Sequence, residues 1–187
     1  MERKVDDRTI LDKFVEDFVR VVEGYCKYIV VSGFVAIAHG RSRGTEDIDM
    51  IIERISKEKF AELHNDLKKA GFECIQSENN AVIYNDYLEK DISVRYVRKG
   101  EMLPEMEVKF VKDGLDEYQI KTRKKLDFTG LDVYFSSVEM NIAFKEELLK
   151  SDKDIEDARH LRIIYKGELD EAEIEKIKKK IQVFRLK

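Results

Sequence analysis

Hydrophobic residues at the start of the chain recur with the period of an α-helix. From Asp7 onward they stand at positions 10, 11, 14, 15, 18, 19 and 22, which predicts one amphipathic helix. Asp7 is a suitable N-cap residue for this helix, and Gly24 is a suitable stop. The pattern then changes, because residues 28–31 (YIVV) form a short apolar run that predicts a buried strand.

A turn of small residues follows this strand. Ser32 and Gly33 break the apolar run, and residues 34–40 (FVAIAHG) are predicted to form a short helix that ends in glycine. Residues 47–52 (DIDMII) predict a second strand. A further amphipathic helix is expected within residues 56–71, because the segment opens with a serine cap and closes with glycine.

The middle of the chain is predicted to be mostly sheet. Its short segments alternate apolar and polar residues or are rich in β-branched and aromatic residues. Residues 78–80 (ENN) resemble a hairpin turn between the first two segments, since asparagine tolerates a positive φ. The strand candidates are residues 72–76, 81–84, 91–97, 107–111, 118–121 and 131–135.

The last fifty residues are predicted to be helical. A Ser-x-x-Glu capping box at Ser136 opens one helix, Ser151 opens the next, and a last helix runs from Asp170. We therefore expect an α+β fold, with a mixed β-sheet core flanked by helices. The core is assigned to residues 1–135, and a helical C-terminal extension packed on it is assigned to residues 136–187.

Composition supports one compact core and argues against several classes of protein. The 187 residues are 43% hydrophobic, and the formal net charge of −4 does not indicate a globally basic nucleic-acid surface. Cys26 and Cys74 are too few for a disulfide framework, which favours a reduced, cytoplasmic setting. No apolar run approaches the roughly 20 residues needed to span a bilayer, so we expect no membrane partner. The three histidines lack metal-ligand spacing and are predicted to be structural.

Two aspartates at the start of the second strand are the main candidates for chemistry. In a strand, residues i and i+2 point to the same side, so Asp47 and Asp49 share one face while Ile48 and Met50 point into the core. Two carboxylates this close need a cation or a proton to neutralise them. Their hard oxygen atoms suit Mg²⁺ or Mn²⁺.

A third carboxylate is expected from a neighbouring strand. In residues 91–96 (DISVRY) the same alternation places Asp91 on one face of a predicted strand. Three carboxylates can hold two divalent ions that assist a phosphoryl or nucleotidyl displacement. Asp86 competes for this role, but it follows asparagine in a segment that resembles a turn.

Ser32 and Gly33 are also candidates to bind a phosphate. They stand between a strand and a helix, where backbone N–H groups are exposed, and glycine permits close approach. Arg43 lies between this turn and the aspartates and could add charge-assisted hydrogen bonds to a polyphosphate.

These residues resemble a known family. The order of strand, small-residue turn, short helix and Arg-x-Thr-x-Asp-x-Asp resembles the DNA polymerase β-type nucleotidyltransferase superfamily, whose signature is a Gly-Gly or Gly-Ser turn followed by Asp-x-Asp or Asp-x-Glu. Thirteen residues separate Gly33 from Asp47, which fits the spacing of that signature, although the turn here reads Ser-Gly. The resemblance implies that Asp47 and Asp49 bind metal and that Asp91 is the third carboxylate. It also implies that Ser32 and Gly33 contact the triphosphate.

The C-terminal part resembles one branch of that superfamily. Residues 137–161 are similar to the lysine helix and the Lys-Asp-x-x-Asp helix of the abortive-infection, toxin-type minimal nucleotidyltransferases. This likeness implies a catalytic role for Lys145 and nucleotide binding by Asp154 and Asp157. Thr45, in the loop before the aspartates, is assigned to nucleotide binding on the same basis.

The expected activity is therefore transfer of a nucleoside monophosphate from a triphosphate such as ATP to an acceptor hydroxyl. Pyrophosphate would be released with the help of Mg²⁺ or Mn²⁺. The acceptor stays open between a tRNA 3′ end, a partner protein and a small molecule. One alternative is a non-catalytic nucleotide- or RNA-binding regulatory module of a toxin-antitoxin type system. Another is a metal-dependent phosphohydrolase.

Overall fold

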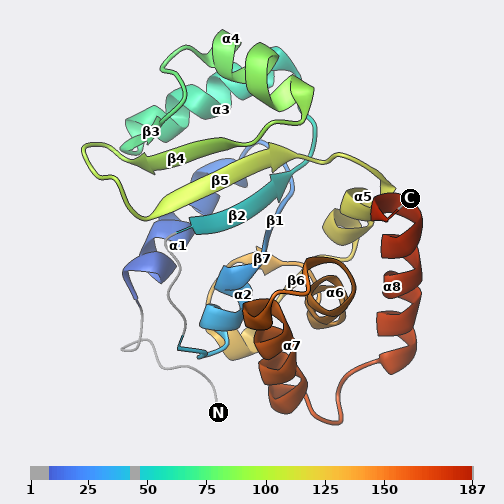
Figure 1. Ribbon diagram of the computed structural model, residues 1–187. Coiled ribbons are helices and arrows are strands. Elements are labelled where there is room, and N and C mark those ends of the chain that lie inside the picture. The colour runs from blue at the N-terminus through green and yellow to red at the C-terminus, as the bar shows by residue number, and fades with distance from the viewer. Residues whose placement is uncertain (1–8, 43–46, 187) are drawn as a thin grey trace.

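The computed structural model describes residues 9–42 and 47–186, and within them the strands form one mixed sheet (Figure 1). The sheet has the order β3-β4-β5-β2-β1-β7-β6. β2 and β5 run parallel, as do β1 and β7, whereas the other neighbours are antiparallel. This confirms the expected α+β class with a mixed sheet. The strands are β1 (Tyr28–Val31), β2 (Asp47–Ile52), β3 (Phe72–Cys74), β4 (Val94–Arg98), β5 (Glu105–Phe110), β6 (Lys124–Lys125) and β7 (Tyr134–Phe135).

Helices flank the sheet. In Figure 1, α1 lies behind the strands, α3 and α4 lie at the upper edge, and α6, α7 and α8 lie below β2 and β5, on the side of β7 and β6. Short π-helical or 3₁₀ turns interrupt or extend several of them. The helices are α1 (Ile10–Val22), α2 (Gly33–Ala38), α3 (Lys57–Lys69), α4 (Asn80–Val82), α5 (Gly114–Lys121), α6 (Val138–Phe144), α7 (Asp152–Ile164) and α8 (Glu171–Arg185). The turns are η2 (Ile83–Tyr87), η3 (Leu88–Lys90), η4 (Asp127–Thr129) and η5 (Lys145–Leu149).

The central strands bury both faces. On β2, Met50 points into the main hydrophobic cluster with α1, whereas Ile51 points to a smaller cluster with Ile120 of α5. On the α1 side, Phe18 meets Phe72 edge to face, with 5.0 Å between the ring centroids. The alternation of β2 therefore sends every second side chain toward α5 and the C-terminal helices.

The C-terminal helices belong to the same hydrophobic cluster as the sheet. Ile174, Ile177 and Ile181 of α8 stand one helical turn apart and are buried with it. The division of the chain at residue 135 remains a proposal. None of the helices in the described part of the chain is long and apolar enough to cross a membrane.

Several helices and strands agree with the sequence patterns. β1, β2, α2 and α3 cover the predicted segments, and the caps predicted for α7 and α8 are present at Ser151 and Asp170.

Two predicted strands are helical instead. Residues 81–84 belong to α4 and the π-helical turn after it, because the Asn79 side chain accepts hydrogen bonds from the Ala81 and Val82 N–H groups and so caps a helix. Residues 118–121 belong to α5, which Asp113 caps in the same way. The hairpin predicted at residues 78–80 is therefore wrong, since short apolar runs do not distinguish a strand from a turn of helix.

Two predicted helix caps are also wrong in position. The first helix begins at Ile10 and is capped by Thr9, which forms a capping box with Asp12. Asp7 lies outside the described residues. The helix predicted to open at Ser136 is capped by Ser137, whose side chain accepts a hydrogen bond from the Met140 N–H.

Candidate active site

Asp47 and Asp49 lie at the start of β2, in the middle of the sheet. β2 runs between β1 and β5, and Asp49 pairs in register with Val31, the last residue of β1. Ile48 and Met50 between and after them are fully buried on the other face. The structure therefore places both aspartates on one face, next to the turn that begins at Ser32, as the strand pattern predicts.

Ser32 has an unusual backbone conformation. Its φ of 69° is rare for a residue other than glycine, and its side chain makes no capping hydrogen bond to α2. Instead, a hydrogen bond from Ser32 helps to lower the pKa of the Asp49 carboxyl, against the stronger effect of burial. This bond links the turn to the aspartates.

Two glutamates on β5 extend the row of carboxylates. In the parallel pairing of β2 with β5, Asp47 stands opposite Glu105 and Asp49 stands opposite Glu107. Neither glutamate is predicted as a site residue from the sequence alone. The alternation of residues 105–110 (EMEVKF) carries the signal, but the pairing of β5 with β2 cannot be seen in the sequence.

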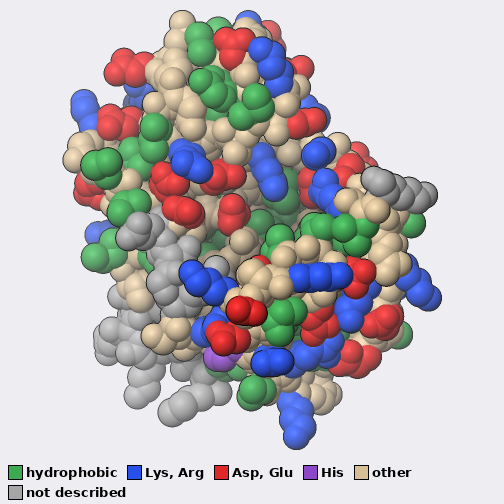
Figure 2. Space-filling model, viewed as in Figure 1, with side chains coloured by type: hydrophobic (Ala, Val, Ile, Leu, Met, Phe, Trp, Pro, Cys, Tyr) green, Lys and Arg blue, Asp and Glu red, His purple; other side chains and the backbone are tan. Residues whose placement is uncertain are grey.

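The carboxylates raise one another's affinity for protons. Burial is the main cause that raises the pKa of Asp49, and repulsion from Glu107 and Asp47 adds to it. Burial likewise raises the pKa of Glu105. Arg95 on β4 offsets part of this charge, since its Nε atom lies 3.3 Å from Glu105 and 3.4 Å from Glu107. Figure 2 shows acidic side chains gathered over β2 and β5, with basic side chains beside them.

The predicted third carboxylate, Asp91, is not on a strand. It follows the 3₁₀ turn η3 with a φ of 58°, and β4 begins only at Val94. Its carboxylate pairs with Arg54. The strand predicted to begin at residue 91 is wrong at its start, because the left-handed conformation of Asp91 ends the preceding turn. Asp86 lies on the π-helical turn, exposed and 3.1 Å from Lys90.

A cavity of about 370 Å³ brings several predicted site residues together. Ser32, Asp49, Asp91 and Lys145 all line it. The sheet contributes one wall, and α5, α6 and the end of α8 contribute the others. Apolar side chains of α6, including Phe144, also line the cavity, so it offers both charged groups and an apolar wall.

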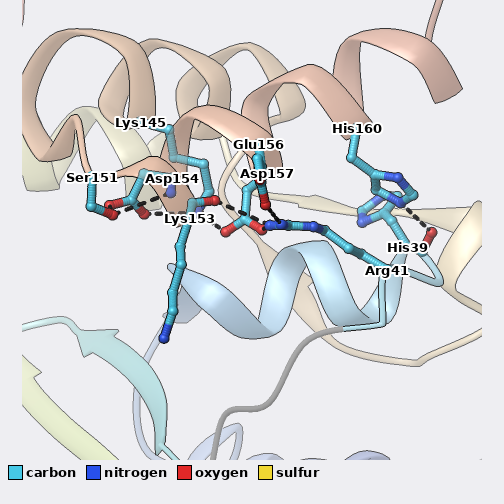
Figure 3. A network of polar contacts seen from close by, with 9 residues as sticks. All are labelled: His39, Arg41, Lys145, Ser151, Lys153, Asp154, Glu156, Asp157 and His160. Carbon is cyan, nitrogen blue, oxygen red and sulfur yellow. Dashed lines mark hydrogen bonds and ion pairs between the residues drawn. The ribbon is translucent and has the colours of Figure 1, made fainter.

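Lys145 reaches the cavity from a buried ionic network (Figure 3). Its Nζ atom lies 2.7 Å from Asp157 and 3.4 Å from Asp154, and only 1% of the lysine side chain is exposed. Asp157 also pairs with Arg41, which pairs in turn with the exposed Glu156. The structure therefore brings together the lysine and both aspartates that the sequence singled out.

Two predicted nucleotide ligands, Arg43 and Thr45, lie outside the described residues. The histidines have structural contacts. His39 is buried with Nδ1 2.6 Å from the Val35 carbonyl oxygen and Nε2 2.8 Å from the Tyr165 hydroxyl, and burial lowers its pKa to about 4. His160 contacts the His39 carbonyl oxygen.

A complete protein cage for a metal ion is absent from residues 9–42 and 47–186. No three His, Cys, Asp or Glu side chains there are grouped so that they could hold an ion by themselves. A Mg²⁺ site that is completed by the substrate needs fewer protein ligands, since the ion is usually bound by one or two carboxylates together with substrate phosphates and water. Asp47 and Asp49 fit that pattern, because strand alternation places both on one face. Burial and repulsion from like charges raise the pKa of Asp49, so a nearby cation would stabilise its carboxylate.

Comparisons with known proteins place the fold. No protein-family model and no curated protein matches the chain. Among solved structures, an antigenic nucleotidyltransferase-like protein from Paracoccidioides brasiliensis matches with a TM-score of 0.53 and 16% identity, over 94% of this chain and 88% of that one. ANT(2″)-Ia in complex with adenylyl-2″-tobramycin matches with a TM-score of 0.55 and 17% identity, over 94% and 98% of the two chains. The solution structure of ANT(2″)-Ia, described as an antibiotic-resistance factor, matches with a TM-score of 0.53 and 13% identity, over 92% and 91%.

These likenesses cover nearly the whole chain at low identity. They show that the chain has a nucleotidyltransferase-like fold.

Proposed function

We propose that the protein is a nucleotidyltransferase that uses Mg²⁺ or Mn²⁺ to transfer a nucleoside monophosphate from an NTP to an acceptor hydroxyl. The observation that carries the proposal is the row of carboxylates at the junction of β2 and β5, beside the Ser32 turn, of which Asp49 lines the cavity. The fold likeness supports it independently, since the neighbours in solved structures are nucleotidyltransferases or resemble them.

In the proposed reaction, the acceptor oxygen forms a bond to the α-phosphorus and the bond from that phosphorus to the bridging oxygen breaks. Pyrophosphate leaves with the electron pair, and the acceptor proton passes to a carboxylate or to water. A divalent ion, when bound, would neutralise charge on the phosphates and on the attacking oxygen. Asp47 and Asp49 would hold it, and Ser32 would keep Asp49 oriented.

Glu107 is the better candidate for the third carboxylate. It stands directly opposite Asp49 on the neighbouring parallel strand, whereas Asp91 lies on a turn and already pairs with Arg54. Glu107 also interacts with Arg95, so its charge is only partly offset. We assign Glu107 the role of general base, and Asp91 a place on the cavity wall.

Lys145, Asp154 and Asp157 are proposed to act as one unit. The two aspartates hold the lysine at the cavity wall, and their negative charges offset the cost of burying its ammonium group. Arg43 and Thr45 remain proposed nucleotide ligands from the loop before β2.

The acceptor class is tested by parallel assays. The protein is incubated with labelled NTPs, Mg²⁺ and three acceptors: bulk tRNA, a protein extract and an aminoglycoside. The third is included because ANT(2″)-Ia was solved with an adenylylated tobramycin. The toxin-type resemblance favours the first two. Labelled acceptor and equimolar pyrophosphate are the expected products.

Variants connect the activity to the carboxylates. Asp49→Asn and Glu107→Gln are expected to reduce transfer by at least about 100-fold, because each removes negative charge needed in the transition state. Asp132→Asn is the matched control, since that side chain is 79% exposed on the far loop. Transfer that survives Asp49→Asn would sink the proposed mechanism. Metal-dependent NTP binding without any transfer would favour a non-catalytic regulatory module, and release of phosphate without labelled acceptor would favour a phosphohydrolase.

A further inference from the structure

Among residues 9–42 and 47–186, four cationic side chains line the cavity: Lys109, Lys112, Lys145 and Arg185. Two of them are already neutralised. Lys145 pairs with two aspartates of α7. Arg185, near the end of α8, has Nη1 2.7 Å from Asp113 and Nη2 2.8 Å from the buried Asp116. Ion pairs with two carboxylates leave little positive field for an anionic ligand.

Lys109 is different. It lies on β5 two residues after Glu107, so strand alternation puts both on the same side, and it pairs in register with Ile51, two residues after Asp49. The side chain is exposed where it lines the cavity. Within the part of the chain that the structure describes, it has no ion pair. Its positive charge is close enough to Asp49 to help lower the pKa of that carboxyl.

Lys112 is the second lysine on this side of the cavity. It comes two residues after the end of β5, is exposed, and lines both this cavity and the groove beside it. Only its backbone N–H is engaged, in a 3.1 Å hydrogen bond to Asp116. Among residues 9–42 and 47–186, no carboxylate forms an ion pair with its ammonium group. Two lysines that form no ion pair with a described residue thus follow the carboxylates, one on β5 and one just after it.

We propose that Lys109 and Lys112 form the anion subsite of the cavity and bind the phosphates of the nucleoside triphosphate. The positions of the charges favour carboxylates that hold the metal ion and lysines that bind the phosphates. Carboxylates stand at the start of β2 and in the first half of β5, whereas Lys109 stands near the end of β5 and Lys112 two residues beyond it. A triphosphate that reached a cation held by Asp47 and Asp49 would lie with its remaining charge toward these lysines. Lys145, held by its two aspartates, is then a structural and positioning group of the wall.

The subsite rests on the proposed function for its biological meaning, but its binding can be tested without catalysis. The probes are ATP and tripolyphosphate, each measured by calorimetry at saturating Mg²⁺. The variants are Lys109→Met, Lys112→Met, their double variant and Lys109→Arg. Lys68→Met is the matched control, because it removes the same charge from the exposed face of α3.

We expect each single methionine variant to weaken binding of both probes by roughly 10-fold or more, since each removes a charge-assisted hydrogen bond to the phosphates. The double variant is expected to lose more, Lys109→Arg to retain most of the affinity, and Lys68→Met to match the wild type. Urea denaturation of each variant checks that the fold is kept. Calorimetry reports the subsite whether or not any acceptor is found.

The proposal is refuted if both methionine variants bind tripolyphosphate and ATP with the same affinity as the Lys68→Met control. It is also refuted if the wild type binds neither probe. A wild type that binds both probes through these lysines but transfers nothing to any acceptor would support the subsite and count against the proposed enzyme. The two failures are therefore distinguishable.

Discussion

The ionic network around Asp157 gives the sharpest prediction about stability. The Asp157 carboxylate is fully buried and bonds Lys145 at 2.7 Å, and it also pairs with Arg41 (Figure 3). Asp157→Ala would remove the nearer carboxylate from the buried Lys145 ammonium group and leave Asp154 at 3.4 Å. Removing one partner of a buried ion pair costs about 3–5 kcal/mol, because the remaining charge is desolvated without compensation.

Arg41 should change this cost little. Its side chain is 17% exposed and keeps its pair with Glu156, so it does not become a buried isolated charge. For a domain of this length, 1 kcal/mol lowers Tm by about 2–4 °C, so Asp157→Ala is expected to lower Tm by about 6–20 °C. Urea denaturation and a thermal scan measure the two quantities.

Glu156→Ala is the matched control, since that carboxylate is 60% exposed and belongs to the same network. Its cost should be below about 0.5 kcal/mol. The double variant Lys145→Met with Asp157→Leu should recover much of the lost stability, because apolar residues replace a desolvated pair. The reasoning is refuted if Asp157→Ala costs no more than Glu156→Ala, or if the double variant is less stable than Asp157→Ala alone.

Three further outcomes follow from the structure. Asp49→Asn should keep or slightly raise the free energy of unfolding while transfer is lost, because it removes a buried charge repelled by its neighbours; a large destabilisation in urea would contradict this. Burial lowers the pKa of His39 to about 4, below the unfolded value of about 6.5. Keeping His39 neutral therefore stabilises the fold fully above about pH 6.5, and this stabilisation is lost as the pH falls toward about 4. The loss should reach about 3 kcal/mol, and comparing urea denaturation of wild type and His39→Gln across that window checks it, since the variant should lack this part of the pH dependence. Thr9→Ala should cost about 1 kcal/mol by removing the N-cap of α1, whereas an unchanged urea midpoint would show that the cap adds nothing.

Much of the architecture was accessible from local patterns. The 3.6-residue period predicts α1 and α3, and the apolar runs predict β1 and β2, because burial of one helix face or of a central strand leaves a regular trace in the sequence. The same reasoning places Asp47 and Asp49 on a shared face. Serine and aspartate caps mark the starts of α7 and α8, since capping depends on residues only three apart.

Errors in the predicted fold concentrate where the pattern is short. Residues 81–84 and 118–121 are too few to show a period, and the caps at Asn79 and Asp113 decide in favour of helix. The left-handed conformation of Asp91 has the same local origin, as it ends a 3₁₀ turn that the sequence pattern does not reveal. Each of these depends on side-chain hydrogen bonds that propensity alone does not resolve.

The sequence by itself determined which residues form the strand carrying Asp47 and Asp49, and that a turn of small residues precedes it. Only the tertiary structure decided that Glu107 faces Asp49, that Lys145 is neutralised by Asp157, and that Lys109 is left to face the cavity. The physical reason is that a residue's face within a strand depends on its own alternation. Its neighbours across the sheet depend on which strands pair, and that choice is made by the packing of the whole core.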